Sequence, residues 1–259
     1  MRLRNKIGIV TGASKGIGEA IALAFAREGA DVVLAARSQD RLEAVAERIR
    51  QLGRRALPVV TDVTQEDSVI AMVKAASNEF GRIDVLVNNA GMGSHRHIAY
   101  TSLQTWETLM GVNLRGPFLC TKHVWKIMEA QGGGSIINIG STSGSHGYAL
   151  MAAYSASKWG LVGLTKSTSA EGAPLGIRVN IVNPDKVLAG PRLLFKDAEP
   201  ILSVDDVVGP VIFLASDDSM HVHGQMIEVA HAPDRPVHTR DRRNGNGVKS
   251  SLESEKESS

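Results

Sequence analysis

The stretch Thr11-Gly12-Ala13-Ser14-Lys15-Gly16-Ile17-Gly18 joins a short run of β-branched residues to an amphipathic helical pattern. Gly12 permits a sharp turn from strand to helix, Gly16 lets the backbone approach a diphosphate, and Gly18 allows the helix to pack closely on a sheet. The N-terminus of the helix offers free N–H groups and the positive end of its dipole to an anion. The strand before the turn and the helix after it favour a dinucleotide-binding turn over a tight turn without a ligand.

Around this turn, short apolar runs alternate with helical patterns. The expected strands are Ile7–Val10, Asp31–Ala36, Ala56–Val60, Ile83–Val87, Ser135–Ile139, Ile177–Val182 and Met226–Val229. The expected helices are Gly16–Glu28, Gln39–Leu52 and Gln65–Phe80, with others within Leu103–Met128, Tyr148–Glu171 and Ser203–Ala215. The strands are nearly continuously apolar, which is typical of parallel strands buried on both faces. Repeated β-α-β order predicts an α/β fold, namely a single-domain Rossmann-type doubly wound parallel sheet of about seven strands with helices on both faces.

Composition narrows the function classes. The chain has 259 residues, and 29 Lys and Arg against 27 Asp and Glu give a net charge of +2. That charge is too small to favour a nucleic-acid or anionic membrane partner. No apolar run reaches the roughly 18 residues of a membrane helix. The single cysteine, Cys120, excludes an intrachain disulfide, and His221 and His223 lack further ligands at metal-binding spacing. We expect a cytoplasmic protein without a metal site.

Residues 1–232 are expected to form one dinucleotide-binding domain, with a proline-rich surface loop over 184–204. From 233 to 259 the chain is almost free of apolar residues, and such a composition cannot bury a core. We therefore expect a disordered C-terminal tail. A partner-binding tail is the alternative, although its nearly balanced charges give no support for a nucleic-acid arm.

The end of the second expected strand indicates which nucleotide would bind. NAD-selective folds have an acidic residue there for the ribose 2′-hydroxyl, but this chain has Ala36 followed by Arg37. Arg37 and Lys15 are two cations suited to a 2′-phosphate, so the sequence favours NADP over NAD. The alternative is that Arg37 contacts only solvent or Asp40.

Further motifs follow along the chain in a fixed order. They are Asp62-Val63, Asn88-Asn89-Ala90-Gly91, Asn113, Ser141, Tyr154-x-x-x-Lys158, and Asn180 with Pro184. Together with the glycine turn, they make residues 4–230 resemble the short-chain dehydrogenase/reductase family, with 3-oxoacyl-carrier-protein reductases as the nearest general resemblance. The resemblance implies an NADP(H)-dependent oxidoreductase that acts on a carbonyl/alcohol pair.

The chemistry explains the residue types at the expected reacting centre. Tyr154 and Lys158 share one face of a helix, and a neighbouring Lys⁺ would lower the pKa of the phenol. Tyr154 would then be the general acid in reduction and the base in oxidation. The resemblance implies that Ser141 orients the substrate oxygen and that Asn113 holds a water of a proton relay. It also implies that Lys158 holds the nicotinamide ribose.

The resemblance assigns the remaining cofactor contacts and the assembly. Asp62 and Val63 would contact the adenine, and Asn89, Ala90 and Gly91 would line the cofactor ribose. Pro184 and Val187 would belong to the segment that clamps the nicotinamide carboxamide. The likeness also implies a homotetramer, or a dimer, formed through the two long helices that carry Asn113 and Tyr154.

The chain departs from the family pattern after the sixth strand. Asp185 replaces a glycine, and it would be strained if the backbone there needed a positive φ. Ala189 replaces a threonine and loses a hydroxyl, and the substrate lid is short. These departures leave open a nucleotide-binding protein with weak or no turnover, in a regulatory or scaffold role. An epimerase or dehydratase would need a larger C-terminal domain. The sequence does not identify the substrate.

Overall fold

A computed structural model describes residues 1–187 and 202–230. Most of the expected loop 184–204 lies outside the described residues, as do Ala189 and the expected tail 233–259. None of the described helices is both long enough and apolar enough to cross a membrane.

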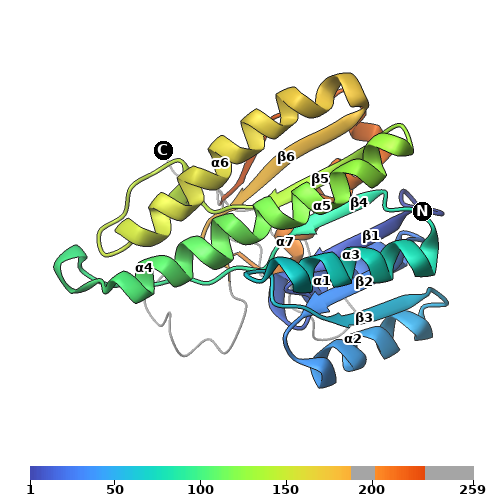
Figure 1. The fold of residues 1–259 in the computed structure, drawn as a ribbon, viewed down its shortest axis with the longest axis horizontal. Helices are drawn as coiled ribbons and strands as arrows, with labels where there is room; N and C mark the ends of the chain where they lie inside the picture. The colour runs from blue at the N-terminus through green and yellow to red at the C-terminus, as the bar shows by residue number, and fades with distance from the viewer. Residues whose placement is uncertain (188–201, 231–259) are drawn as a thin grey trace, which may run out of the picture.

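Seven parallel strands form one sheet in the order β3-β2-β1-β4-β5-β6-β7 (Figure 1). The strands are β1 Ile7–Thr11, β2 Asp31–Ala36, β3 Ala56–Val60, β4 Val85–Asn88, β5 Gly134–Ile139, β6 Ile177–Pro184 and β7 Met226–Val229. Strand order reverses at β1, which lies between β2 and β4. Open α/β sheets bind ligands outside the carboxyl ends of the strands at such a point. The predicted doubly wound parallel sheet is confirmed.

Helices cover both faces of the sheet (Figure 1). Helices α1 Gly16–Arg27, α2 Gln39–Gln51 and α7 Val204–Ala215 pack on one face, and α3 Glu66–Phe80, α5 Gly116–Ala130 and α6 Ala152–Gly172 lie against the other. Phe25, Leu42 and Val207 belong to the core of the first layer, whereas Met72 and Val124 belong to the core of the second. The β-branched strand residues contribute to both cores, which fixes the sheet between two helical layers.

The expectation that all strands are buried on both faces is wrong for the two edges. β1 and β6 are fully buried, but β3 is only partly buried and Val60 at its end is 53% exposed. In β7, Met226 is also exposed. An edge strand has a neighbour on one side only, and apolar β-branched residues alone do not show which strand lies at an edge.

The helical pattern predicted within Leu103–Met128 is divided in the structure. Helix α4, Leu103–Met110, runs into a π-helical turn at Gly111–Arg115, which continues as α5. A π-turn adds a residue to the helical repeat and is frequent at functional sites. The turn carries Asn113, a predicted site residue.

Candidate functional site

A cleft of about 920 Å³ lies at the carboxyl ends of β1 to β6. The predicted site residues that line it are Gly12, Ser14, Lys15, Gly16, Ile17, Arg37, Asp62, Val63, Asn89, Ala90, Gly91, Ser141, Tyr154, Lys158, Pro184 and Val187. Gly18 and Asn113 are buried and do not line the cleft. Residues far apart in the sequence meet here because parallel strands end at the same edge of the sheet.

The glycine turn forms the floor of one end of the cleft. Gly12 has a φ of 67°, which L side chains rarely adopt. A Cβ atom on Gly18 would lie 2.3 Å from the carbonyl oxygen of Gly12 and 2.4 Å from Nδ2 of Asn89. Helix α1 begins at Gly16, next to this turn. The close backbone packing and the helix N-terminus fit a diphosphate group.

Hydrogen bonds fasten the glycine turn to the end of β4. Nδ2 of Asn89 donates to the carbonyl oxygen of Thr11 at 2.9 Å. The hydroxyl oxygen of Thr11 accepts from the backbone N–H groups of Asn89 and Ala90, each at 3.0 Å. Asn89 therefore also holds together the two strands at the reversal of strand order, a contribution that the sequence alone did not indicate.

Positive side chains gather at the end of the cleft beside β2 and β3. Arg37 and Lys15 line it together with Arg41, which was not among the site residues predicted from the sequence. Arg41 lies near the start of α2, whereas Arg37 precedes this helix, so no helical spacing in the sequence pairs the two cations. Within the described residues, the ion pairs include none formed by these three cations, so the alternative pairing of Arg37 with Asp40 is not observed.

Asp62 has a fixed carboxylate at the same end of the cleft. Its Oδ1 accepts from the backbone N–H of Thr64 at 2.9 Å and from the Thr64 hydroxyl at 2.8 Å. The backbone hydrogen bond from Thr64 lowers the pKa of Asp62, and the charge of Arg37 lowers it further. Asp62 is therefore an ionised acceptor at neutral pH.

Tyr154, Ser141 and Lys158 meet at the other end of the cleft. Burial raises the pKa of Tyr154, and a hydrogen bond with Ser141 counteracts part of this. The sequence predicted the opposite direction, from a neighbouring Lys⁺. Nζ of Lys158 lies 5.8 Å from the centre of the Tyr154 ring and donates to the carbonyl oxygen of Ile139 at 2.8 Å. Burial also lowers the pKa of Lys158 to about 8, so desolvation dominates at both groups.

Asn113 lies behind this centre and ties three segments together. Its Oδ1 accepts from the backbone N–H of Met92, and its Nδ2 donates to the Met92 carbonyl, both at 2.9 Å. Nδ2 also donates to Oγ of Ser157 on α6 at 3.0 Å. A Cβ on Gly91 would lie 3.5 Å from Oδ1 of Asn113 and 3.8 Å from Nζ of Lys158. Asn113 thus borders Lys158 across Gly91, and the expected water relay stays a prediction.

The position of Ser141 depends on a residue that sequence reasoning did not identify. The backbone N–H of Ser141 donates to Oδ1 of Asn183 at 3.2 Å. Asn183 is fully buried on β6, which extends two residues beyond the predicted end at Val182. Because β5 and β6 are neighbours only in the tertiary structure, no local pattern could have paired these residues.

Comparisons with known proteins find relatives along most of the chain. A family model described as short chain dehydrogenase matches residues 6–191. The chain is 36% identical over 248 residues to the uncharacterized oxidoreductase YxjF of Bacillus subtilis, a match covering 87% of this chain and 96% of that protein. It is 36% identical to the 3-oxoacyl-[acyl-carrier-protein] reductase FabG of Thermotoga maritima, with coverage of 88% and 98%. A crystal structure of a short-chain type dehydrogenase/reductase from Mycobacterium marinum superposes with a TM-score of 0.82 at 36% identity, with coverage of 88% and 94%.

Proposed function

Because the chain belongs to the short-chain dehydrogenase/reductase family of oxidoreductases, we propose that it is an NADP(H)-dependent enzyme acting on a carbonyl/alcohol pair. The observation that carries this proposal is that one and the same cleft holds the glycine turn and Arg37 at one end and Tyr154 with Lys158 at the other. This cleft has room and donors for a dinucleotide, and it ends at a group able to transfer a proton.

Different parts of the cleft would bind different parts of the nucleotide. The glycine turn and the start of α1 would hold the diphosphate, and Asp62 with Val63 would contact the adenine. Arg37, Lys15 and Arg41 would surround a 2′-phosphate, a group that NAD lacks. When bound, the nicotinamide supplies a hydride. Lys158 would hold its ribose at the reacting end.

Proton transfer at the substrate oxygen would belong to Tyr154. In reduction, its hydroxyl donates a proton to the oxygen of the developing alkoxide, and Ser141 orients that oxygen by a hydrogen bond. The phenol is protonated at neutral pH and so has a proton to donate, although burial raises its pKa and makes it a weaker acid than a free tyrosine. A cation held at Lys158, together with the positive charge of an oxidised nicotinamide, would favour the phenolate needed for the reverse reaction.

Parallel titrations of the purified protein with NADPH and NADH, followed by the fluorescence of the reduced nicotinamide, test the cofactor. We expect tight binding of NADPH and weaker binding of NADH, because only the former offers the 2′-phosphate to Arg37. The variant Arg37→Asp is expected to lose the preference for NADPH, whereas Arg27→Asp, on α1 outside the cleft, keeps it. An unchanged preference in Arg37→Asp would assign the phosphate to Lys15 or Arg41.

A panel of carbonyl compounds added to the NADPH complex separates the enzyme from the binding-only alternative. Loss of the reduced-nicotinamide signal with any ketone supports the oxidoreductase. Tight binding of NADPH without turnover of any carbonyl would favour a nucleotide-binding protein in a regulatory or scaffold role. Failure to bind either nucleotide would contradict both.

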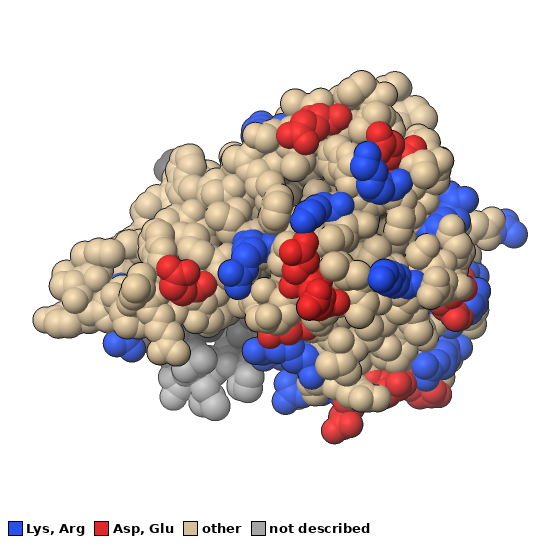
Figure 2. Space-filling model, in the orientation of Figure 1, with Lys and Arg blue, Asp and Glu red and all other residues tan. Residues whose placement is uncertain are grey.

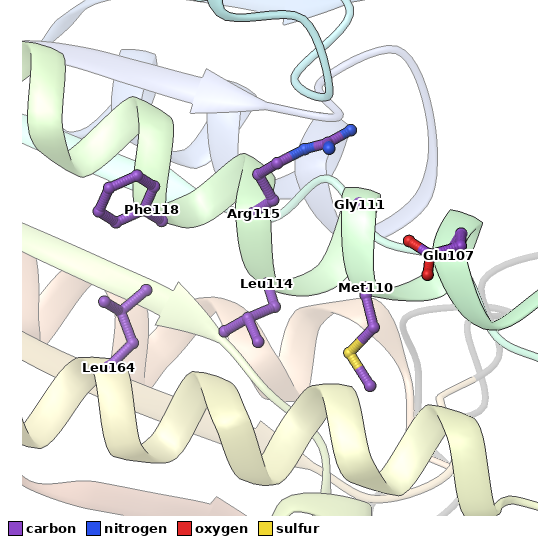
Figure 3. A pocket seen from close by; sticks show the side chains of 7 residues that line it. All are labelled: Glu107, Met110, Gly111, Leu114, Arg115, Phe118 and Leu164. Atoms are coloured by element: carbon purple, nitrogen blue, oxygen red, sulfur yellow. The ribbon is translucent and has the colours of Figure 1, made fainter.

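We also propose a homo-oligomer, with a tetramer as the expected state. Figure 2 shows that the surface over α4 and the adjoining part of α6 carries few charges, whereas Lys, Arg, Asp and Glu gather near α2 and α3. A hollow of about 370 Å³ lies on this face. Met110 and Leu114 point from the α4–α5 side toward α6, and Leu164 points back from α6 (Figure 3). Phe118 borders the hollow and is 46% exposed, so the face offers apolar area to a second copy.

Sedimentation velocity tests the assembly. We expect the wild type to sediment as a tetramer and Phe118→Glu to shift toward smaller species, because a charge would be buried in the contact. Leu52→Glu is the matched control, because Leu52 is 43% exposed at the end of α2, outside this face. A wild-type protein that stays monomeric across the concentration range would contradict the proposal.

A further inference from the structure

Asp185 lies at the reacting end of the cleft, where the family pattern has a glycine. Its backbone N–H donates to the carbonyl oxygen of Val229 at 2.9 Å, which continues the pairing of β6 with β7 beyond Pro184. Asp185 is not among the residues with a positive φ, so the strain considered from the sequence is absent. The side chain is partly exposed and lines the same cleft as Tyr154 and Ser141. The substitution is therefore accommodated by the backbone and places a carboxylate in the cleft.

Hydroxyl groups orient this carboxylate. Oγ1 of Thr142 donates to Oδ1 of Asp185 at 3.2 Å, and the hydroxyl of Tyr148 donates to Oγ1 of Thr142 at 3.3 Å. Thr142 directly follows Ser141, the residue expected to orient the substrate oxygen. Because Asp185 lines the same cleft as Ser141 and Tyr154 and is bound by the neighbour of Ser141, its carboxylate lies at the end of the cleft where the substrate oxygen is expected.

The carboxylate is not neutralised by the described part of the protein. None of the ion pairs among the described residues involves Asp185. Lys158, the buried cation at this end of the cleft, donates instead to the carbonyl oxygen of Ile139. One oxygen of Asp185 is bound by Thr142, and its second oxygen forms no hydrogen bond with a described residue. A ligand in the cleft would therefore meet an oriented anion with free acceptor capacity.

We propose that Asp185 selects substrates that carry a protonated amine a few bonds from the reacting carbonyl or alcohol, and disfavours substrates with an anionic group at that place. The inference rests on the proposed function, because it takes Ser141 and Tyr154 as the contacts of the substrate oxygen. A hydrogen bond between ammonium and carboxylate is stronger than one between neutral groups, and a partly desolvated site strengthens the attraction. An anion at the same place would be repelled for the same reason.

Two ketones of nearly equal shape test this selection. Protonated 1-(dimethylamino)propan-2-one carries N–H⁺ where 4-methylpentan-2-one carries C–H, so the two differ almost only in charge. Acetoacetate supplies the anionic comparison. Binding of each ketone to the protein loaded with NADP⁺ is measured by NMR titration, because this combination cannot react and the comparison needs no turnover. The kcat/KM values with NADPH provide the second readout.

We expect the wild type to prefer the ammonium ketone over its neutral counterpart by about 10-fold to 100-fold in both readouts, the range of a hydrogen bond to a charged group. Asp185→Asn keeps the shape and removes the charge, so the ratio should fall to about one on the same reasoning. Thr142→Val keeps the charge but releases the carboxylate, and it should give an intermediate ratio. Acetoacetate should bind more weakly than the neutral ketone only where Asp185 is present.

Glu228→Gln is the matched control. Glu228 is exposed on the neighbouring strand β7, is bound by the hydroxyl of Ser145 and does not line the cleft. Its loss changes the net charge by the same amount as Asp185→Asn, and it should leave the preference for the ammonium ketone in place. If Glu228→Gln removes the preference equally, the preference comes from the overall negative charge around the cleft, and the assignment to Asp185 is wrong.

The outcomes separate this inference from the proposed function. Reduction of the neutral ketone without any ammonium preference overturns the inference alone. Equal affinities for the ammonium ketone and the neutral ketone in the NMR titration also overturn the inference, whether or not turnover is observed. If Asp185→Asn instead changes the relative affinity for NADP⁺ and NADPH and leaves the ketone ratio intact, the carboxylate acts on the cofactor and the inference is likewise overturned. Failure to bind NADPH or NADH contradicts the proposed function instead.

Discussion

Replacing Tyr154 with phenylalanine is expected to lower kcat by about a hundredfold to ten-thousandfold, the usual contribution of a general acid or base. The change removes only the hydroxyl that would donate to the substrate oxygen. The ring remains, and with it the packing at the cleft, so the affinity for NADPH should change little. Turnover of any substrate from the carbonyl panel and the dissociation constant for NADPH are the two measurements.

Tyr100→Phe is the control for this substitution. Tyr100 is 74% exposed and lies outside the cleft, so loss of its hydroxyl should leave both turnover and nucleotide affinity as in the wild type. Equal turnover in Tyr154→Phe and the wild type would show that another group transfers the proton. A large loss of NADPH affinity in Tyr154→Phe would instead assign its hydroxyl to cofactor binding.

Gly18→Ala is expected to disrupt the nucleotide end of the cleft. The new Cβ would lie 2.3 Å from the carbonyl oxygen of Gly12, which is backbone and cannot rotate away. Overpacking of a well-packed site costs about 1–3 kcal/mol, so the free energy of unfolding should fall by this order. The affinity for NADPH should fall as well, because the start of α1 must move away from the turn that would hold the diphosphate. Chemical denaturation and fluorescence titration measure the two effects.

Gly163→Ala provides the matched comparison. Gly163 also lies within a helix, α6, but nothing is within 4 Å of a Cβ placed there. Alanine is favoured over glycine inside a helix by about 0.5–1 kcal/mol, so this variant should not be less stable and should keep its affinity for NADPH. If Gly18→Ala matches Gly163→Ala in both measurements, the close approach of α1 to the glycine turn does not matter for binding.

Much of the fold could be predicted because its signals are local. The β-branched run of β2, Asp31–Ala36, has the predicted bounds, and the glycine turn ends where α1 begins. Residues close together in the sequence determine the order of strand, turn and helix, and right-handed β-α-β connections leave few alternative topologies. The π-turn at Gly111–Arg115 was not predicted, because adding one residue to a helical repeat changes no local residue preference.

The candidate site divides in the same way. Tyr154 and Lys158 are four residues apart on one helix, so their proximity follows from the sequence. Their protonation behaviour does not, because it depends on burial and on the Ile139 carbonyl that accepts from Lys158. Asn183 could not be predicted for a related reason: it lies on β6, whereas Ser141, which donates to it, follows the neighbouring strand β5.

The sequence by itself determined the parallel α/β fold, the glycine turn and the set of residues offered for chemistry, because these depend on spacing and residue type along one segment. The tertiary structure decided which of those groups meet and what they experience there. It set Arg41 beside Arg37 in one cleft and aimed Thr142 at Asp185, although 43 residues separate the latter pair. The physical reason is that strand pairing and burial are long-range: the neighbours of a side chain, and the water it loses, are fixed only when the sheet and both helical layers have formed.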